Sequence, residues 1–147
     1  MNVLVDTSVW SLVLRRQQGK AGTVTTELAN LVQEGRVVML GAIRQELVSG
    51  IRTQPQFEKL REHLRAFPDV ELGTTDYETA ALYFNTCQGS GIQGSNTDFL
   101  LCAVAGRHGY AIFTTDKDFA QYARFLPVTL HKQSVADDPS LSEHPPR

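Results

Sequence analysis

The sequence predicts an α/β fold with three layers, α/β/α, in which helices cover both faces of a mostly parallel central sheet. Two observations lead to this prediction. Short apolar runs rich in β-branched residues, such as residues 3–5 and 37–40, suit strands that are buried on both faces of a parallel sheet. Segments with apolar residues at helical spacing alternate with these runs along the chain, which is typical of α/β proteins.

Each expected element is identified from its own pattern. After the strand at residues 3–5, apolar residues recur at helical spacing from Val9 onward, and Thr7 and Ser8 are candidates for the N-cap. Further helices are expected at residues 23–34, 42–51, 55–67, 76–87 and 98–108, with a short helix opened by residues 116–119. Further strands are expected at residues 37–40, 70–72, 111–115 and 128–130.

Length and composition predict one globular domain. The chain has 147 residues, of which 41% are hydrophobic and 20% are charged, close to ordinary globular usage. We expect residues 1–132 to form this domain and residues 133–147, rich in Ser, Asp, Pro and Glu, to be a flexible C-terminal tail. No stretch approaches the roughly 20 apolar residues that cross a bilayer, and no basic signal peptide opens the chain, so we expect a cytoplasmic protein without a membrane partner.

Four acidic side chains stand where the chain is expected to reach one edge of the sheet. Asp6 and Asp116 each follow a strand, Asp98 falls in the first turn of a helix, and Glu46 lies about one turn beyond the second strand. Helices that follow parallel strands return across the sheet, so their first turns lie at the carboxyl ends of the strands. Taken alone, each acid is explained as a cap, a turn residue or a surface side chain. Their joint placement predicts an acidic cluster at the edge where open α/β sheets bind ligands.

Such a cluster indicates a metal-dependent reaction. Neighbouring carboxylates raise each other's pKa and weaken the fold, and a divalent cation removes this repulsion. Hard oxygen ligands without His or Cys favour Mg²⁺ or Mn²⁺ over zinc, and the four histidines and two cysteines of the chain show no zinc-like spacing. These ions polarise phosphoryl oxygens and activate water, so phosphodiester hydrolysis would require no protein nucleophile.

Four segments of the sequence resemble the PIN-domain ribonucleases and, more narrowly, the VapC toxins of bacterial toxin–antitoxin pairs. They are residues 5–10, the helix with Glu46, Leu47 and Gly50, residues 92–105 around Asp98, and residues 112–119. The resemblance covers about residues 2–130. It implies a PIN-like fold and endoribonuclease activity that depends on Mg²⁺, with Mn²⁺ as a substitute. It also implies an RNA substrate, a homodimer, and inhibition by a cognate antitoxin protein whose tail enters the active cleft.

The same resemblance implies roles for individual residues. Carried over to this chain, it assigns catalysis to Asp6, Glu46, Asp98 and Asp116, and metal binding to Asp6, Asp98 and Asp116. Asp118 is a fifth acid next to this set and a candidate to assist it.

Other side chains are expected to assist the acids. Ser8 and Thr115 lie next to the strand-end acids and could orient a carboxylate or a bound water molecule. The basic loop with Arg15, Arg16 and Lys20 would hold RNA phosphates, with a solvated connector as the equally weighted interpretation.

Two other functions fit parts of the pattern. A receiver-like phosphotransfer domain also places acids at strand ends, but it usually has two adjacent acids after its first strand, whereas Asp6 follows Val5 alone. A scaffold of the same fold that binds RNA or a partner without cutting is the other alternative. Residues 89–94 match the dinucleotide pattern G-x-G-x-x-G, but a helix rather than a strand precedes them, so a flexible connector is the favoured interpretation.

Overall fold

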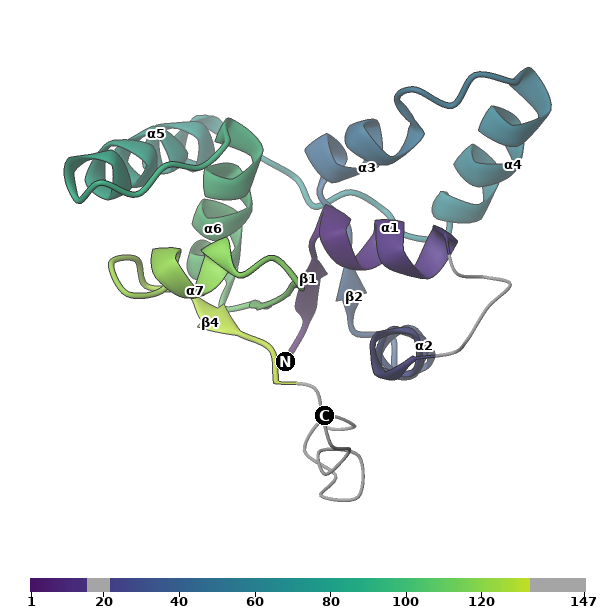
Figure 1. Ribbon diagram of the computed structural model, residues 1–147, viewed down its shortest axis with the longest axis horizontal. Coiled ribbons are helices and arrows are strands. Elements are labelled where there is room, and N and C mark those ends of the chain that lie inside the picture. The colour runs from purple at the N-terminus through teal and green to yellow at the C-terminus, as the bar shows by residue number, and fades with distance from the viewer. Residues whose placement is uncertain (16–21, 133–147) are drawn as a thin grey trace, which may run out of the picture.

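The computed structural model describes residues 1–15 and 22–132, which form four strands and seven helices (Figure 1). The strands are β1 (Val3–Val5), β2 (Val37–Val38), β3 (Ala111–Phe113) and β4 (Thr129–Leu130). The helices are α1 (Thr7–Arg15), α2 (Thr23–Gln33), α3 (Gly41–Val48), α4 (Gln54–Leu64), α5 (Thr74–Gly89), α6 (Asn96–His108) and α7 (Asp118–Tyr122).

The four strands form one parallel sheet in the order β2-β1-β3-β4. β1 lies in the middle, and its residues Val3–Val5 are fully buried, as the continuous apolar run predicts. Val5 pairs with Phe113 of β3, so the chain segments that follow β1 and β3 leave the sheet at the same edge. The predicted α/β fold with a parallel central sheet is confirmed.

Helices α5 and α6 pack side by side next to the sheet (Figure 1). Six residues of α6 are buried, among them Leu101–Ala105, because this helix lies between α5 and the sheet. The Asp76 side chain is fully buried near the start of α5, where it accepts hydrogen bonds from the Gly73 N–H (2.9 Å) and from the Arg107 guanidinium of α6. Burial alone would raise the pKa of Asp76, but these donors hold it below its ordinary value.

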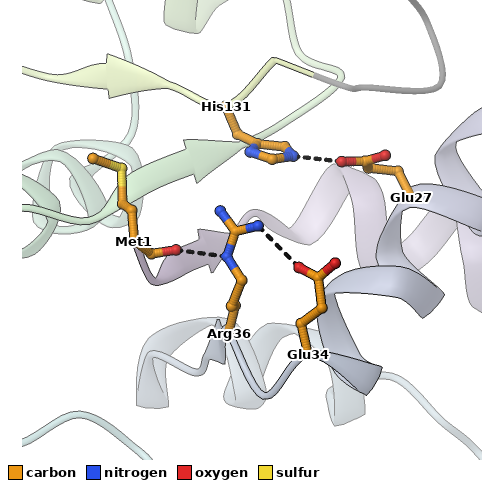
Figure 2. A network of polar contacts seen from close by, with 5 residues as sticks. All are labelled: Met1, Glu27, Glu34, Arg36 and His131. Atoms are coloured by element: carbon orange, nitrogen blue, oxygen red, sulfur yellow. Dashed lines mark hydrogen bonds and ion pairs between the residues drawn. The ribbon is translucent and has the colours of Figure 1, made fainter.

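A second set of polar contacts connects α2 with the segment that follows β4, at one edge of the sheet (Figure 2). His131, just after β4, lies 2.7 Å from the Glu27 carboxylate of α2, and both side chains are largely buried. Arg36 donates to the Met1 carbonyl (2.8 Å) and to the Glu34 carboxylate (3.0 Å). These contacts attach α2 and the segment before β2 to the strands beside them.

The structure differs from the sequence-based expectation at several element ends. The strand expected at residues 70–72 is wrong: the isolated bridge here pairs Met39 with Asp69, just before this segment, and the Val70 N–H donates to the Met39 carbonyl (2.9 Å). Arg44 donates hydrogen bonds to Asp69 and to the Phe67 carbonyl, which holds the chain just before this segment against α3. β3 ends at Phe113, before the two threonines that were expected to belong to it.

The start of α1 also differs from the sequence-based expectation. The two expected N-caps, Thr7 and Ser8, lie in the first turn of the helix, because the Asp6 carbonyl already accepts hydrogen bonds from the N–H groups of Val9 and Trp10. The expected C-terminal tail, residues 133–147, lies outside the described residues. No helix in the described part of the chain is both long and apolar enough to cross a membrane.

Candidate active site

Asp6 lies between β1 and α1, at the carboxyl end of the central strand. Its N–H donates to the Phe113 carbonyl of β3 (2.9 Å), which continues the sheet hydrogen bonding up to this residue. The Asp6 side chain is almost buried, with 7% exposure, and its Oδ2 accepts hydrogen bonds from Ser8 Oγ (2.7 Å) and Thr114 Oγ1 (2.8 Å). Two hydroxyl groups therefore hold the Asp6 carboxylate in place.

Thr114 connects the two strand-end acids. Its O–H group donates to the Asp6 carboxylate, and its oxygen accepts a hydrogen bond from the Asp116 N–H (3.0 Å). The Asp116 carboxylate in turn accepts a hydrogen bond from the Asp118 N–H (2.9 Å), so Asp118 contacts Asp116 through its backbone. Asp6 and Asp116 thus lie on either side of one hydroxyl group, at the sheet edge where the sequence places them.

Asp98 lies in the first turn of α6. Its N–H donates to the N-cap Ser95 Oγ (3.1 Å), and its Oδ2 accepts a hydrogen bond from the Tyr122 hydroxyl (2.7 Å). Burial raises the pKa of Asp98 and the negative charge of Asp6 adds to this rise, while the hydrogen bonds from Tyr122 and Ser95 act against it. The effect of Asp6 on this pKa indicates that the two carboxylates lie close enough to repel each other.

Glu46 is exposed on α3, and the structure brings it to the start of α1. Thr7 Oγ1, in the residue directly after Asp6, donates a hydrogen bond to Glu46 Oε1 (2.7 Å). The sequence alone favours an ordinary surface glutamate at this position. The contact with Thr7 places this exposed glutamate next to the residue that follows Asp6.

The assisting residues lie partly where the sequence places them. Ser8 donates to Asp6 and accepts a hydrogen bond from the Thr115 N–H (3.0 Å), but the Thr115 side chain is exposed. It is the Thr114 hydroxyl that reaches Asp6. Because Val5 pairs with Phe113, the residues that directly follow the two strands, Asp6 and Thr114, lie level with each other.

Of the three expected RNA-binding residues, the structure describes Arg15. Arg15 is exposed at the end of α1, where its Nε donates to the Ser11 carbonyl (3.3 Å). Arg16 and Lys20 lie outside the described residues.

Comparison with known proteins identifies the family. The model of the PIN domain family matches residues 3–125 of this chain. This chain belongs to the PIN domain family. The resemblance seen in the sequence is confirmed.

Relatives of this PIN domain include Ribonuclease VapC11 of Mycobacterium tuberculosis, which is 28% identical over 126 residues, covering 83% of this chain and 92% of that protein. The structure of VapBC2 from Rickettsia felis bound to a DNA fragment from their promoter matches with a TM-score of 0.72 and 15% identity, over 89% of this chain and 98% of that one. FitAcB from Neisseria gonorrhoeae matches with a TM-score of 0.70 and 20% identity, over 89% and 97%. These two structures show the shared fold.

Sequence reasoning missed Tyr122, whose hydroxyl donates a hydrogen bond to Asp98 in this PIN domain. Burial raises the pKa of the Tyr122 phenol far above its ordinary value, and the hydrogen bond to Asp98 and the charges of Asp98, Asp118 and Asp116 add to the rise. The phenol therefore stays protonated and acts as a hydrogen-bond donor. Its spacing from Phe119 suggests only a core position, so no sequence signal reveals the contact with Asp98.

The donor atoms at this edge of the PIN domain fit a hard divalent cation. Asp6, Asp98 and Asp116 offer only carboxylate oxygens, the ligands that Mg²⁺ and Mn²⁺ prefer. The Cys102 thiol, one turn after Asp98, is not a competing thiolate ligand, because burial and the charges of Asp98, Cys87 and Asp6 raise its pKa far above its ordinary value.

The side chains do not form a finished cage. Across residues 1–15 and 22–132, no three Asp, Glu, His or Cys side chains stand close enough together to hold an ion as they are placed. The hydroxyl groups of Ser8, Thr114 and Tyr122 occupy carboxylate oxygens of Asp6 and Asp98 instead. Catalytic groups are often looser without their ligands, so binding would involve small rotations of these carboxylates.

Proposed function

We propose that this PIN domain is the endoribonuclease toxin of a toxin–antitoxin pair and hydrolyses RNA phosphodiester bonds with Mg²⁺ or Mn²⁺. The observation that carries the proposal is the placement of Asp6, Asp98 and Asp116 around the carboxyl ends of β1 and β3. The similarity to Ribonuclease VapC11 supports RNA as the substrate.

In this proposal each acid has a defined role. Asp6, Asp98 and Asp116 hold the cation through their carboxylate oxygens. When bound, the ion supplies an activated water molecule and stabilises the charge that develops on the phosphate. Glu46, whose Oε1 is held by Thr7, receives the proton of the attacking water at its other carboxylate oxygen. No serine or cysteine nucleophile is required.

The similarity to toxin–antitoxin proteins also indicates partners for this chain. We propose that a cognate antitoxin inhibits the enzyme, because the structural neighbours include VapBC complexes from Rickettsia felis and Haemophilus influenzae.

We also propose that the chain forms a homodimer and that it acts in the cytoplasm. The exposed Arg15 contacts RNA phosphates in this proposal. Size-exclusion chromatography with light scattering would test the dimer directly.

RNA cleavage tests the proposed function. The purified protein is incubated with a panel of tRNAs and rRNA fragments, with MgCl₂ or with EDTA. We expect discrete cleavage with Mg²⁺ and none with EDTA, and a loss of cleavage of at least about 100-fold in Asp116→Asn. Glu46→Gln should also lose activity, whereas Glu78→Gln, at an exposed glutamate of α5, should cut like the wild type.

Two results would contradict the proposal. Cleavage that continues undiminished in EDTA or in Asp116→Asn would remove the acids from the reaction. Tight RNA binding without any cleavage across the panel would instead favour the non-cleaving scaffold.

A further inference from the structure

Tyr122 connects the two chain segments that carry Asp98 and Asp116. It is the last residue of α7, the helix that begins just after Asp116, and its hydroxyl donates to Asp98 Oδ2 (2.7 Å). Its ring is fully buried and packs against two other aromatic rings, with centroid distances of 4.9 Å to Phe99 and 5.0 Å to Phe119. This close packing restrains the ring, so the position of its hydroxyl is set by the core.

Gly94 provides the space that this hydroxyl needs. A Cβ atom on Gly94 would lie 2.3 Å from the Tyr122 hydroxyl oxygen and 2.9 Å from Phe99 Cε2, distances that are too short for non-bonded atoms. Gly94 is the last glycine of residues 89–94, for which the sequence favours a flexible connector. The structure gives this glycine a steric function instead.

We propose that Tyr122 is a positioning residue of the acidic edge. Its hydroxyl holds Asp98 Oδ2 and so leaves the other carboxylate oxygen to bind the divalent cation, and Gly94 leaves room for that hydroxyl. This inference rests on the proposed function, because it assigns Asp98 to the cation. Hydrogen-bond partners of metal ligands typically change metal affinity by about 10–100-fold when they are removed.

A simpler role is that of a core aromatic residue. In that case the ring alone matters, and loss of the hydroxyl would change neither the orientation of Asp98 nor its affinity for metal. The two roles differ in the consequence of removing one oxygen atom. Tyr122→Phe makes this change and keeps the ring packing.

Isothermal titration of the full-length protein with MnCl₂, without RNA, separates the two roles. We expect Tyr122→Phe to bind Mn²⁺ about tenfold more weakly than the wild type. Tyr110→Phe is the matched control: Tyr110 is half-buried and stacks on His108 (5.1 Å between ring centroids), and loss of its hydroxyl should leave Mn²⁺ affinity unchanged. Melting curves in EDTA verify that both variants are folded.

Gly94→Ala provides a second, independent variant, because it displaces the hydroxyl without removing it. It should also weaken Mn²⁺ binding, and the double variant with Tyr122→Phe should lose less than the product of the two single losses, since both act through one hydrogen bond. Equal affinity of Tyr122→Phe and the wild type would overturn this inference alone. Absence of Mn²⁺ binding by the wild type would overturn the proposed metal site and this inference with it.

Discussion

At the scale of single residues, the site depends on which hydroxyl group reaches which carboxylate. Sequence reasoning assigns the assisting role after β3 to Thr115, one position beyond the residue that has it. The register decides this, because Val5 pairs with Phe113 and so brings Asp6 level with Thr114. Successive residues of an extended chain point in opposite directions, so an error of one residue exchanges an inward hydroxyl for an exposed one.

This pair of threonines gives a matched test. Thr114→Val keeps the shape of the side chain but removes the hydrogen bonds to Asp6 and Asp116, so we expect RNA cleavage to fall by at least about tenfold. Thr115→Val should cut at nearly the wild-type rate, because only the backbone of Thr115 contacts Ser8. The opposite order of the two rates would show that the orientation of Asp6 does not depend on Thr114.

The raised pKa of Asp98 predicts how the metal-free protein responds to pH. A carboxyl group whose pKa is higher in the folded state stabilises the fold fully below its unfolded pKa, about pH 4, and this contribution is lost as pH rises through the folded pKa. In EDTA, the melting temperature of Asp98→Asn should therefore increase relative to that of the wild type between about pH 4 and pH 7. A wild type that gains stability over the variant across this range would contradict a raised pKa of Asp98 in the folded protein.

At the scale of elements, the α5–α6 pair holds Asp98 in place through contacts remote from the acids. Asp76 receives the Gly73 N–H at the start of α5 and the Arg107 guanidinium from the last turn of α6. The two helices are thereby joined near the end of α6 that is opposite to Asp98. This connection fixes how α6 presents its first turn to the sheet edge.

Removal of this connection should lower the stability of the fold. Asp76→Ala leaves two donors without their buried acceptor, so we expect the free energy of unfolding at pH 7 to fall by about 1–3 kcal/mol in urea titrations. The pKa of Asp76 is lowered in the folded state, so its contribution is present above about pH 4 and is lost as pH falls through the folded value. The difference from the wild type should therefore shrink below pH 4, while Glu78→Ala, at an exposed position of α5, stays within about 0.5 kcal/mol of the wild type throughout.

Elements whose signal is local could be predicted from the sequence. The apolar run of β1 followed by Asp6, and the Ser95 cap with Asp98 in the first turn of α6, contain their own evidence in adjacent residues. Contacts between distant segments could not be predicted in this way. Thr7 with Glu46, and Tyr122 with Asp98, depend on how helices are placed across the sheet, and neither pair has a spacing that reveals it.

At the scale of the whole molecule, the parallel sheet is what concentrates negative charge. Every strand ends at the same edge, so acids that follow β1 and β3 meet there although they are far apart in the chain. Hydroxyl groups partly compensate this charge, while burial and, to a smaller extent, the charge of Asp6 raise the pKa of Asp98. A cation that binds only the folded state would relieve this repulsion and stabilise the protein by mass action.

The most direct test is a crystal structure of the protein grown with MnCl₂, in which anomalous scattering locates the manganese. We expect a peak at the carboxyl edge of β1 and β3, within about 2–2.5 Å of carboxylate oxygens of Asp6, Asp98 and Asp116. Manganese bound only elsewhere, or no peak at millimolar Mn²⁺, would contradict the assignment of these three acids to a metal-dependent nuclease site.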